Sequence, residues 1–263
     1  MRGFKMITVK QIELAIKTVK REKYVITDLC KYFKKYGSDK AYPDNIQKKR
    51  QKYRTKCKRK EISVHNYSNF YDKIFSSIRN KNINLFEMGI GSRDPYVKSN
   101  MCHMNYEESL SIGCSVNAWS DYFINGNIYA ADIDEKLVFE NKEKRIKTFK
   151  CDQNSKEDFL EIMKKINCEF DIIIDDGRHT PDANLNFFKS SFSFLKKGGI
   201  YIVEDVMLSK YIPGKVEQNN TKTIAELHNE NLEYFKKHAS FVKLVELDKT
   251  INTRDNNIII IKK

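Results

Sequence analysis

The strongest constraint on this chain is a change of pattern after residue 80, where short apolar runs begin to alternate with segments of helical spacing. The strand-like runs cover residues 83–90, 127–134, 145–152, 170–177 and 198–206. The helix-like segments cover residues 115–123, 155–166, 183–195 and 223–238. This alternation predicts a doubly wound α/β sheet with mostly parallel strands. The last two runs, 241–247 and 256–263, are close enough in sequence to form an antiparallel hairpin.

The first 80 residues contain no comparable alternation and predict a helical N-terminal extension, or lid, ahead of a domain at 81–263. Apolar residues recur at helical spacing within 8–35, and a second aromatic-rich helical face lies within 65–78. The stretch YGSDK, residues 36–40, has the composition of a turn.

Cysteine use and hydropathy exclude several classes of protein. The six cysteines form no CxxC pair and no zinc-ligand spacing, which is typical of free thiols in a reducing compartment. The N-terminus has no apolar signal-peptide core, and no run approaches the roughly 20 apolar residues of a membrane helix. We therefore expect a cytoplasmic protein without a membrane span.

Acidic residues stand at or just after the carboxyl ends of the predicted strands. They are Glu87, Asp132, Asp134, Asp152, Asp175, Asp176, Glu204 and Asp205. Ligands of open α/β sheets bind beyond these strand ends. The first loop lacks the GxGxxG pattern, which argues against a NAD-linked oxidoreductase, and acids do not favour phosphate. They favour a ligand that is cationic, rich in hydroxyls or accompanied by a metal, and S-adenosylmethionine (SAM) fits this description.

The stretch FEMGIGS, residues 86–92, resembles the E/D-x-G-x-G motif of class I SAM-dependent methyltransferases. IYAADID resembles the second motif of that class, and KCDQ resembles the third. The resemblance implies a Rossmann-like sheet with an antiparallel terminal strand. It also implies SAM contacts by Glu87, Gly89, Gly91 and Ser92 in the first loop, by Asp132 on the ribose with Asp134 beside it, and by Asp152 and Gln153 near the adenine.

Five stretches narrow the resemblance to the macrocin O-methyltransferase group, which are metal-dependent sugar O-methyltransferases. They are YGSDK, HNYSNFYDKIF, GCSVNAWSDYF, DIIIDDGRHT and LKKGGIYIVEDV. The resemblance implies Asp176, Glu204 and Asp205 as metal ligands and His179 as general base. It also implies that Tyr36, Ser38, Asp39 and Lys40 form a strip over SAM, and that His65 and Tyr67 line the acceptor side.

The residues themselves support this chemistry. A sugar hydroxyl is a poor nucleophile until its proton leaves, and both a divalent metal and a general base promote that step. Asp176, Glu204 and Asp205 offer the hard oxygen ligands that suit Mg²⁺, and His179 follows Asp176 by three residues. Asp175 has three open roles: holding a neighbouring ligand in place, contacting SAM, or binding the metal.

The charge of the chain is concentrated in one segment. Residues 41–64 carry nine basic and two acidic residues, a net +7 of the formal +13 of the whole chain. We interpret this segment as an insertion that forms a lid or attracts an anionic acceptor.

We therefore predict a SAM- and Mg²⁺-dependent O-methyltransferase acting on a sugar or on a surface-polysaccharide-linked acceptor, including anionic and nucleotide-linked ones. The resemblance also implies a homo-oligomer, because enzymes of this group tend to oligomerise through their N-terminal elements. Two alternatives stay open: an RNA methyltransferase that uses residues 41–64, and a non-catalytic SAM-binding scaffold in polysaccharide assembly. Nucleic acid is the less favoured partner because no appended RNA-binding domain is visible in the sequence.

Overall fold

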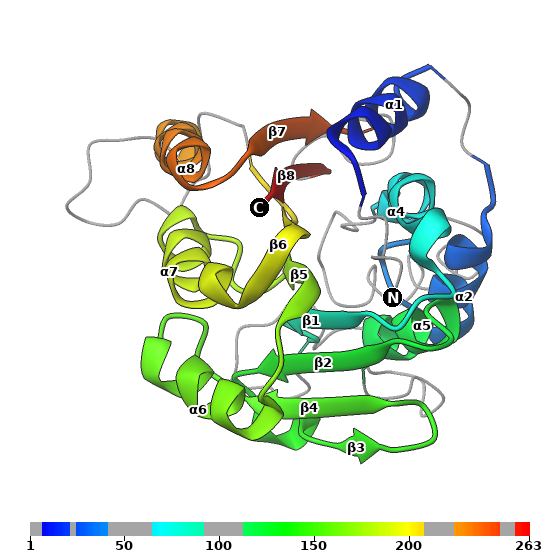
Figure 1. Ribbon diagram of the computed structural model, residues 1–263, viewed down its shortest axis with the longest axis vertical. Helices are drawn as coiled ribbons and strands as arrows, with labels where there is room; N and C mark the ends of the chain where they lie inside the picture. Colours follow the sequence, from blue (N-terminus) through cyan, green and yellow to red (C-terminus); the bar gives the residue numbers. More distant parts are fainter. Residues whose placement is uncertain (1–6, 22–24, 42–64, 92–112, 208–223, 248–255) are drawn as a thin grey trace, which may run out of the picture.

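The computed structural model describes residues 7–21, 25–41, 65–91, 113–207, 224–247 and 256–263, and these contain one eight-stranded sheet (Figure 1). The strands are β1 (Asn84–Met88), β2 (Asn127–Asp132), β3 (Glu140–Asn141), β4 (Ile146–Lys150), β5 (Phe170–Asp175), β6 (Leu195–Val203), β7 (Phe241–Glu246) and β8 (Asn257–Lys262). Their order is β3-β4-β2-β1-β5-β6-β8-β7. The pairs from β4 through β6 are parallel, whereas β8 is antiparallel to both β6 and β7. The predicted sheet and its antiparallel terminal hairpin are confirmed.

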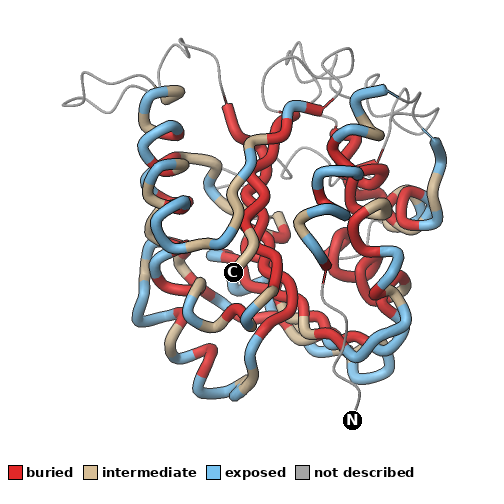
Figure 2. Tube along the Cα trace, turned by 45° about the horizontal axis from the view of Figure 1, so that its top comes forward, coloured by how far each residue is buried: buried red, intermediate tan, exposed pale blue. Residues whose placement is uncertain are grey.

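Helices cover both faces of the sheet. They are α1 (Val9–Val19), α2 (Asp28–Tyr36), α4 (Tyr67–Phe75), α5 (Cys114–Tyr122), α6 (Lys156–Ile166), α7 (Pro181–Ser191) and α8 (Ile224–His238). In Figure 1, α6, α7 and α8 lie on one side of the sheet, and α1, α2, α4 and α5 lie on the other. The buried strands run as a central layer between these helices, whose exposed faces point outward (Figure 2). None of the helices in the described ranges is long and apolar enough to cross a membrane.

The sheet separates two apolar cores, and the alternation of side chains along each strand supplies both. On β1, Leu85 packs with the N-terminal helices, and the next residue, Phe86, packs with α6 and α7. On β5, Ile172 and Ile173 divide between the two cores in the same way. The helices of the predicted N-terminal extension therefore share a hydrophobic core with the sheet.

Some predicted boundaries were wrong, and local hydrogen bonds explain one of them. The helix predicted over 8–35 is two helices, because residues 25–27 are not helical and the side chain of Thr27 caps α2 at Cys30. The helix predicted over 183–195 ends at Ser191, and Leu195 already belongs to β6, where it pairs with Phe170. The short strand β3 was not predicted. The predicted basic insertion lies outside the described residues except for Ala41.

One buried histidine outside the sheet edge is notable for its electrostatics. His228 on α8 is 1% exposed, and neither ring nitrogen has a hydrogen-bond partner within the described part of the chain. Burial lowers the pKa of His228 to about 4, because the charged imidazolium would lose its hydration. The folded protein therefore holds this side chain neutral at pH 7.

We expect His228 to make folding sensitive to mild acid. The unfolded chain binds a proton at this histidine below pH of about 6.5, whereas the folded chain does so only near 4. The free energy of unfolding therefore falls as the pH drops between these values, by at most about 3 kcal/mol. Urea unfolding of wild type and His228→Leu across this window measures the difference. The matched control is His238→Leu, at the exposed end of the same helix, and an identical pH dependence in wild type and His228→Leu would contradict the expectation.

Candidate active site

The carboxyl ends of three neighbouring strands bring four acids together. Strand β5 pairs with β1 on one side and β6 on the other, with Asp175 opposite both Met88 and Val203. Four acids therefore reach the same edge of the sheet. They are Glu87 near the end of β1, Asp176 just after β5, and Glu204 and Asp205 just after β6. We call these four residues, together with Lys40, the carboxylate cluster. The sequence prediction that these acids meet at the sheet edge is reproduced by the structure.

A lysine from the N-terminal region sits in the middle of this cluster. The Lys40 Nζ lies 2.5 Å from Asp176 Oδ2 and 3.4 Å from Glu87 Oε1, and it also donates to Glu204 Oε2. Lys40 is 2% exposed, and Glu87 and Glu204 are buried as deeply. The ammonium group is therefore the central positive charge among three carboxylates.

Neutral donors from the helices complete the cluster. The hydroxyl of Tyr71 donates to Glu204 Oε1 at 2.5 Å, and that of Tyr67 donates to Asp205 Oδ1 at 2.6 Å. The hydroxyl of Ser115 on α5 donates to Glu87 Oε2 at 2.6 Å. Because Tyr67 and Tyr71 are four residues apart on α4, they lie on the same face of that helix. The helices beside the sheet thus supply the partners that these buried acids need.

Burial and charge act in opposite directions on this cluster. Burial lowers the pKa of Lys40, but the attraction of Asp176, Glu204 and Glu87 outweighs it, so that the pKa lies well above its ordinary value. Burial raises the pKa of Glu204 and of Glu87, and the Lys40 charge offsets only part of that rise. Burial alone would raise the pKa of Asp205. The attraction of His65 and His179 and the hydrogen bond from Tyr67 outweigh this effect, so that the pKa is lowered.

Asp176, His179 and Asp205 form a group with the geometry of a metal site. One ligand atom from each of the three lies within 4.8 Å of the other two. The His179 Nε2 is 3.7 Å from Asp205 Oδ2 and 4.0 Å from Asp176 Oδ1. His179 and Asp205 both have left-handed backbone conformations, with φ of 58° and 54°. Non-glycine residues in this conformation cost free energy, and they concentrate at functional sites. Glu204 is outside this group, and its two oxygens accept from Lys40 and Tyr71.

The glycine loop after β1 lies against the same edge. Gly89 has φ of 85°, and a Cβ on it would lie 2.2 Å from the carbonyl oxygen of Asp176. The backbone of Ile90 donates to Asp132 Oδ2 at 2.9 Å, which joins the loop to the predicted ribose acid. Gly91 also has a left-handed conformation, with φ of 86°. Ser92 lies outside the described residues.

The remaining predicted SAM contacts mainly fix local structure here. Asp175 is fully buried and accepts from Gln153 Nε2 at 2.7 Å and Asn184 Nδ2 at 3.0 Å. Burial raises the pKa of Asp175 to about 7. Gln153 in turn accepts from the backbone of Arg178 at 2.7 Å. Of the three open roles of Asp175, these contacts favour holding the segment before His179 in place.

Three further predicted residues bond within their own segments. Asp152 accepts from the backbone of Asn154 at 2.8 Å, and Asp134 from that of Lys136 at 3.0 Å. The Ser38 hydroxyl accepts from the backbone of Lys40 at 3.3 Å, where it helps shape the turn that carries the lysine.

Sequence reasoning named Lys40 only as part of a strip over SAM, and it treated Tyr71 as an apolar helix residue. The structure turns Lys40 inward to the carboxylate cluster, and directs the Tyr36 hydroxyl to Asp121 at 2.7 Å. Tyrosines spaced by four residues on an otherwise apolar helix face were the available signal, because a buried tyrosine hydroxyl needs a partner.

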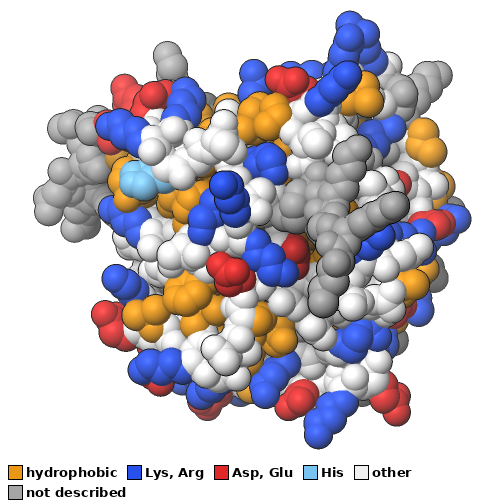
Figure 3. Space-filling view, viewed as in Figure 1, with side chains coloured by type: hydrophobic (Ala, Val, Ile, Leu, Met, Phe, Trp, Pro, Cys, Tyr) orange, Lys and Arg blue, Asp and Glu red, His pale blue; other side chains and the backbone are white. Residues whose placement is uncertain are grey.

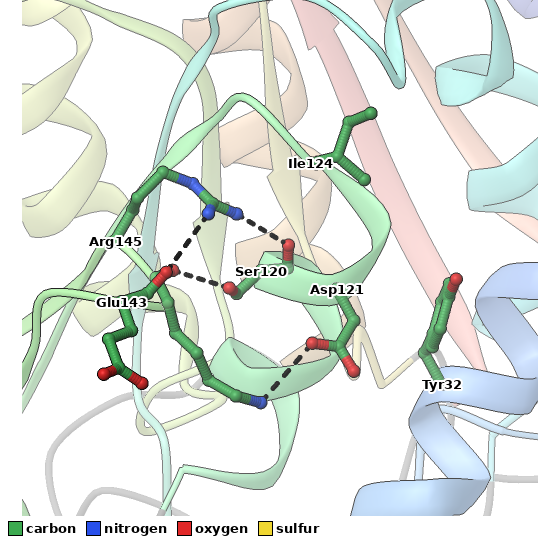
Figure 4. Close-up of a pocket in the computed structure, with 7 residues that line it drawn as sticks. Tyr32, Ser120, Asp121, Ile124, Glu143 and Arg145 are labelled. Carbon is green, nitrogen blue, oxygen red and sulfur yellow. Dashed lines mark hydrogen bonds and ion pairs between the residues drawn. The ribbon is translucent and has the colours of Figure 1, made fainter.

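An open cavity of about 370 Å³ lies beside α5, away from the carboxylate cluster (Figure 4). Its lining residues are Tyr32, Ser120, Asp121, Ile124, Glu143, Lys144 and Arg145. Arg145 donates to the carbonyl of Ser120 at 3.0 Å, and Lys144 pairs with Asp121 at 3.4 Å. The polar groups thus bond largely to one another, and no predicted site residue lines this cavity.

Known proteins resemble the chain in sequence and in fold. No protein-family model matches it. It is 32% identical over 151 residues to mycinamicin VI 2''-O-methyltransferase of Micromonospora griseorubida, which covers 57% of this chain and 34% of that protein. It is 32% identical over 152 residues to demethylmacrocin O-methyltransferase of Streptomyces fradiae, with 58% and 34% covered. The chain thus spans about a third of the length of these relatives.

Among solved structures, the MycE methyltransferase of mycinamycin biosynthesis, in complex with Mg and SAH, has a TM-score of 0.58 at 24% identity. The match covers 90% of this chain and 55% of that one. The strand order and this likeness define a class I methyltransferase fold. Within that class, the chain resembles the macrocin and mycinamicin sugar O-methyltransferases, as the five sequence stretches predicted.

We expect Gly89→Ala to damage this edge of the sheet. The left-handed conformation alone costs about 1–2 kcal/mol for alanine, and the new Cβ would also collide with the Asp176 backbone. Thermal and urea unfolding should show a loss above that range. The matched control is Gly198→Ala, which has a similar φ of 80° but lies near the opposite end of β6, and should lose only the conformational part. Equal losses in the two variants would contradict the predicted collision.

Proposed function

We propose that this chain is a SAM-dependent O-methyltransferase that uses a divalent metal, with Mg²⁺ as the expected ion, and acts on a sugar hydroxyl. The observation that carries the proposal is the convergence of Asp176, His179 and Asp205 beside the glycine loop of a class I methyltransferase fold. The relatives support it, since they are named as O-methyltransferases of mycinamicin VI, demethylmacrocin, L-olivosyl-oleandolide and a rhamnosyl tetracenomycin.

The residues at the sheet edge suit a hard divalent cation. Mg²⁺ prefers carboxylate oxygens and is commonly held by one or two acids together with water and substrate. Asp176 and Asp205 provide such oxygens, and we propose them as ligands, with Glu204 as the third acid of the set. A divalent cation at this position would lower the pKa of a substrate hydroxyl and orient it.

His179 is proposed as the general base, with Asp176 beside it. Its Nε2 faces both Asp176 and Asp205 without being within hydrogen-bond distance of either, so it is available to take a proton from a hydroxyl placed between them. The turn that carries His179 is held by Gln153 through the backbone of Arg178. This support fixes the position of the imidazole relative to the two acids.

The proposed SAM site adjoins the same acids. Gly89 and Gly91 bring the backbone close to the edge of the sheet, and Asp132 lies beside them for a ribose diol. The four acids and one lysine of the carboxylate cluster leave three negative charges when all are ionised. SAM carries one net positive charge and Mg²⁺ two, so that together they would balance the cluster.

The proposed acceptor is a sugar or a sugar-linked molecule, and we extend this to anionic or polysaccharide-linked acceptors. The exposed Arg178, adjacent to His179, supports a negative charge on the acceptor. On the face seen in Figure 3, Lys and Arg side chains are interspersed with Asp and Glu.

We expect the metal to be required for methyl transfer. SAH released from SAM, measured against a panel of glycosides, should stop in EDTA and return with Mg²⁺. Asp205→Asn should weaken Mn²⁺ binding at least about tenfold, because a ligand charge is lost. Asp121→Asn, which removes an acid outside the cluster, is the matched control. Full turnover in chelator would contradict the metal requirement.

We expect His179→Ala to lower the rate of methyl transfer by roughly 10²-fold while SAM and Mn²⁺ still bind, because the proton acceptor is lost. Calorimetry gives the two affinities, and SAH release gives the rate. Replacing the exposed His238 by alanine controls for a general effect of removing a histidine. A variant that keeps the wild-type rate would exclude His179 as the base.

A further inference from the structure

The carboxylate cluster already contains a cation that belongs to the protein. The Lys40 ammonium contacts Asp176 and Glu204, which are two of the three proposed metal ligands, and it also reaches Glu87. Its side chain is buried, so water cannot substitute for these contacts. A divalent cation held by Asp176, Glu204 and Asp205 therefore has to share these acids with Lys40 or displace it.

We propose that Lys40 is the resident counter-cation of the carboxylate cluster and competes with the divalent metal for Asp176 and Glu204. The inference rests on the proposed function and adds to it a positioning residue that sets the affinity for metal. It also links metal binding to the N-terminal region, because Lys40 lies in the turn that follows α2, and this turn is fixed by Ser38 and by the left-handed Gly37.

The positive charge of Lys40 should compete with a bound divalent metal and not assist its binding. Three carboxylates close together, of which Glu87 and Glu204 are buried, repel one another strongly when no cation is present. Lys40 relieves this repulsion and so stabilises the fold before metal arrives. The same positive charge then repels an incoming divalent cation, and it occupies one oxygen each of Asp176 and Glu204.

The unequal surroundings of the acids indicate where the metal would bind first. Asp176 Oδ2 accepts a hydrogen bond from Lys40, whereas Asp176 Oδ1 faces His179. Asp205 contacts His65, His179 and Tyr67, and the charge of Lys40 acts on it more weakly than those of the two histidines. Asp176 Oδ1 and Asp205 are therefore the part of the cluster where a metal would meet less competition from Lys40. Glu204, which is bonded to Lys40, would become a ligand only after Lys40 is displaced.

The test compares Mn²⁺ affinity in wild type and Lys40→Met, measured by electron paramagnetic resonance of free Mn²⁺. Methionine keeps an unbranched stem of similar length and removes the charge. We expect the variant to bind Mn²⁺ at least tenfold more tightly, because a competing cation is gone and Glu204 becomes available. A residue with a merely structural role would instead leave the affinity unchanged or weaken it.

Two further variants keep the test decisive. Lys35→Met removes an exposed lysine near the end of α2 that pairs with Asp121 at 2.7 Å, and it should bind Mn²⁺ as wild type does. If Lys40→Met does not fold, the comparison moves to the Glu204→Gln background, where Lys40→Met leaves the cluster with less uncompensated charge. There too, loss of Lys40 should tighten Mn²⁺ binding.

The outcomes separate this inference from the proposed function. Folded Lys40→Met protein with wild-type or weaker Mn²⁺ affinity overturns the competition, while the proposed function stands. Wild-type protein that binds no Mn²⁺ and no SAM overturns both. Tighter binding in Lys40→Met together with unchanged binding in Lys35→Met supports the inference.

Discussion

The structure depends on how four acids are kept at one buried edge of a sheet. Removing carboxylates from water costs several kcal/mol for each ion, and bringing them together adds repulsion. Lys40 supplies the central opposing charge, and Tyr67, Tyr71 and Ser115 supply hydrogen bonds. All four donors come from segments outside the strands that carry the acids. The sheet edge and the helices that cover it therefore form one electrostatic unit.

This dependence explains why the N-terminal helices pack as they do. The rings of Tyr71 and Trp119 contact each other in a tilted arrangement, with centroids 5.5 Å apart, and Trp119 also meets Phe33 of α2 at 5.0 Å. The apolar packing of α2, α4 and α5 holds the tyrosine hydroxyls and the turn with Lys40 at the sheet edge. Hydrophobic packing on one side of the sheet is thus what gives the polar cluster its geometry.

The fold could be predicted from the sequence because its signals are local. Apolar runs such as FDIIID identify buried strands, and the parallel arrangement then brings their acidic ends together. The contacts of Lys40 could not be predicted in the same way. They join residues 136 and 164 positions apart, and neither spacing nor composition reports a side chain that turns inward. The break before Thr27 and the early start of β6 at Leu195 were missed because capping and strand pairing overrode helical periodicity there.

The strain at this edge argues for catalysis over passive binding. A scaffold that only bound a nucleoside would gain stability from apolar or neutral residues in place of the buried acids. This chain instead keeps the acids, and it holds His179 and Asp205 in left-handed conformations whose cost the rest of the structure must offset. Both residues face the same small space beside Asp176. Costs that converge on one point, next to a histidine whose buried Nδ1 has no hydrogen-bond partner among the described residues, favour the proposed proton removal over a binding scaffold.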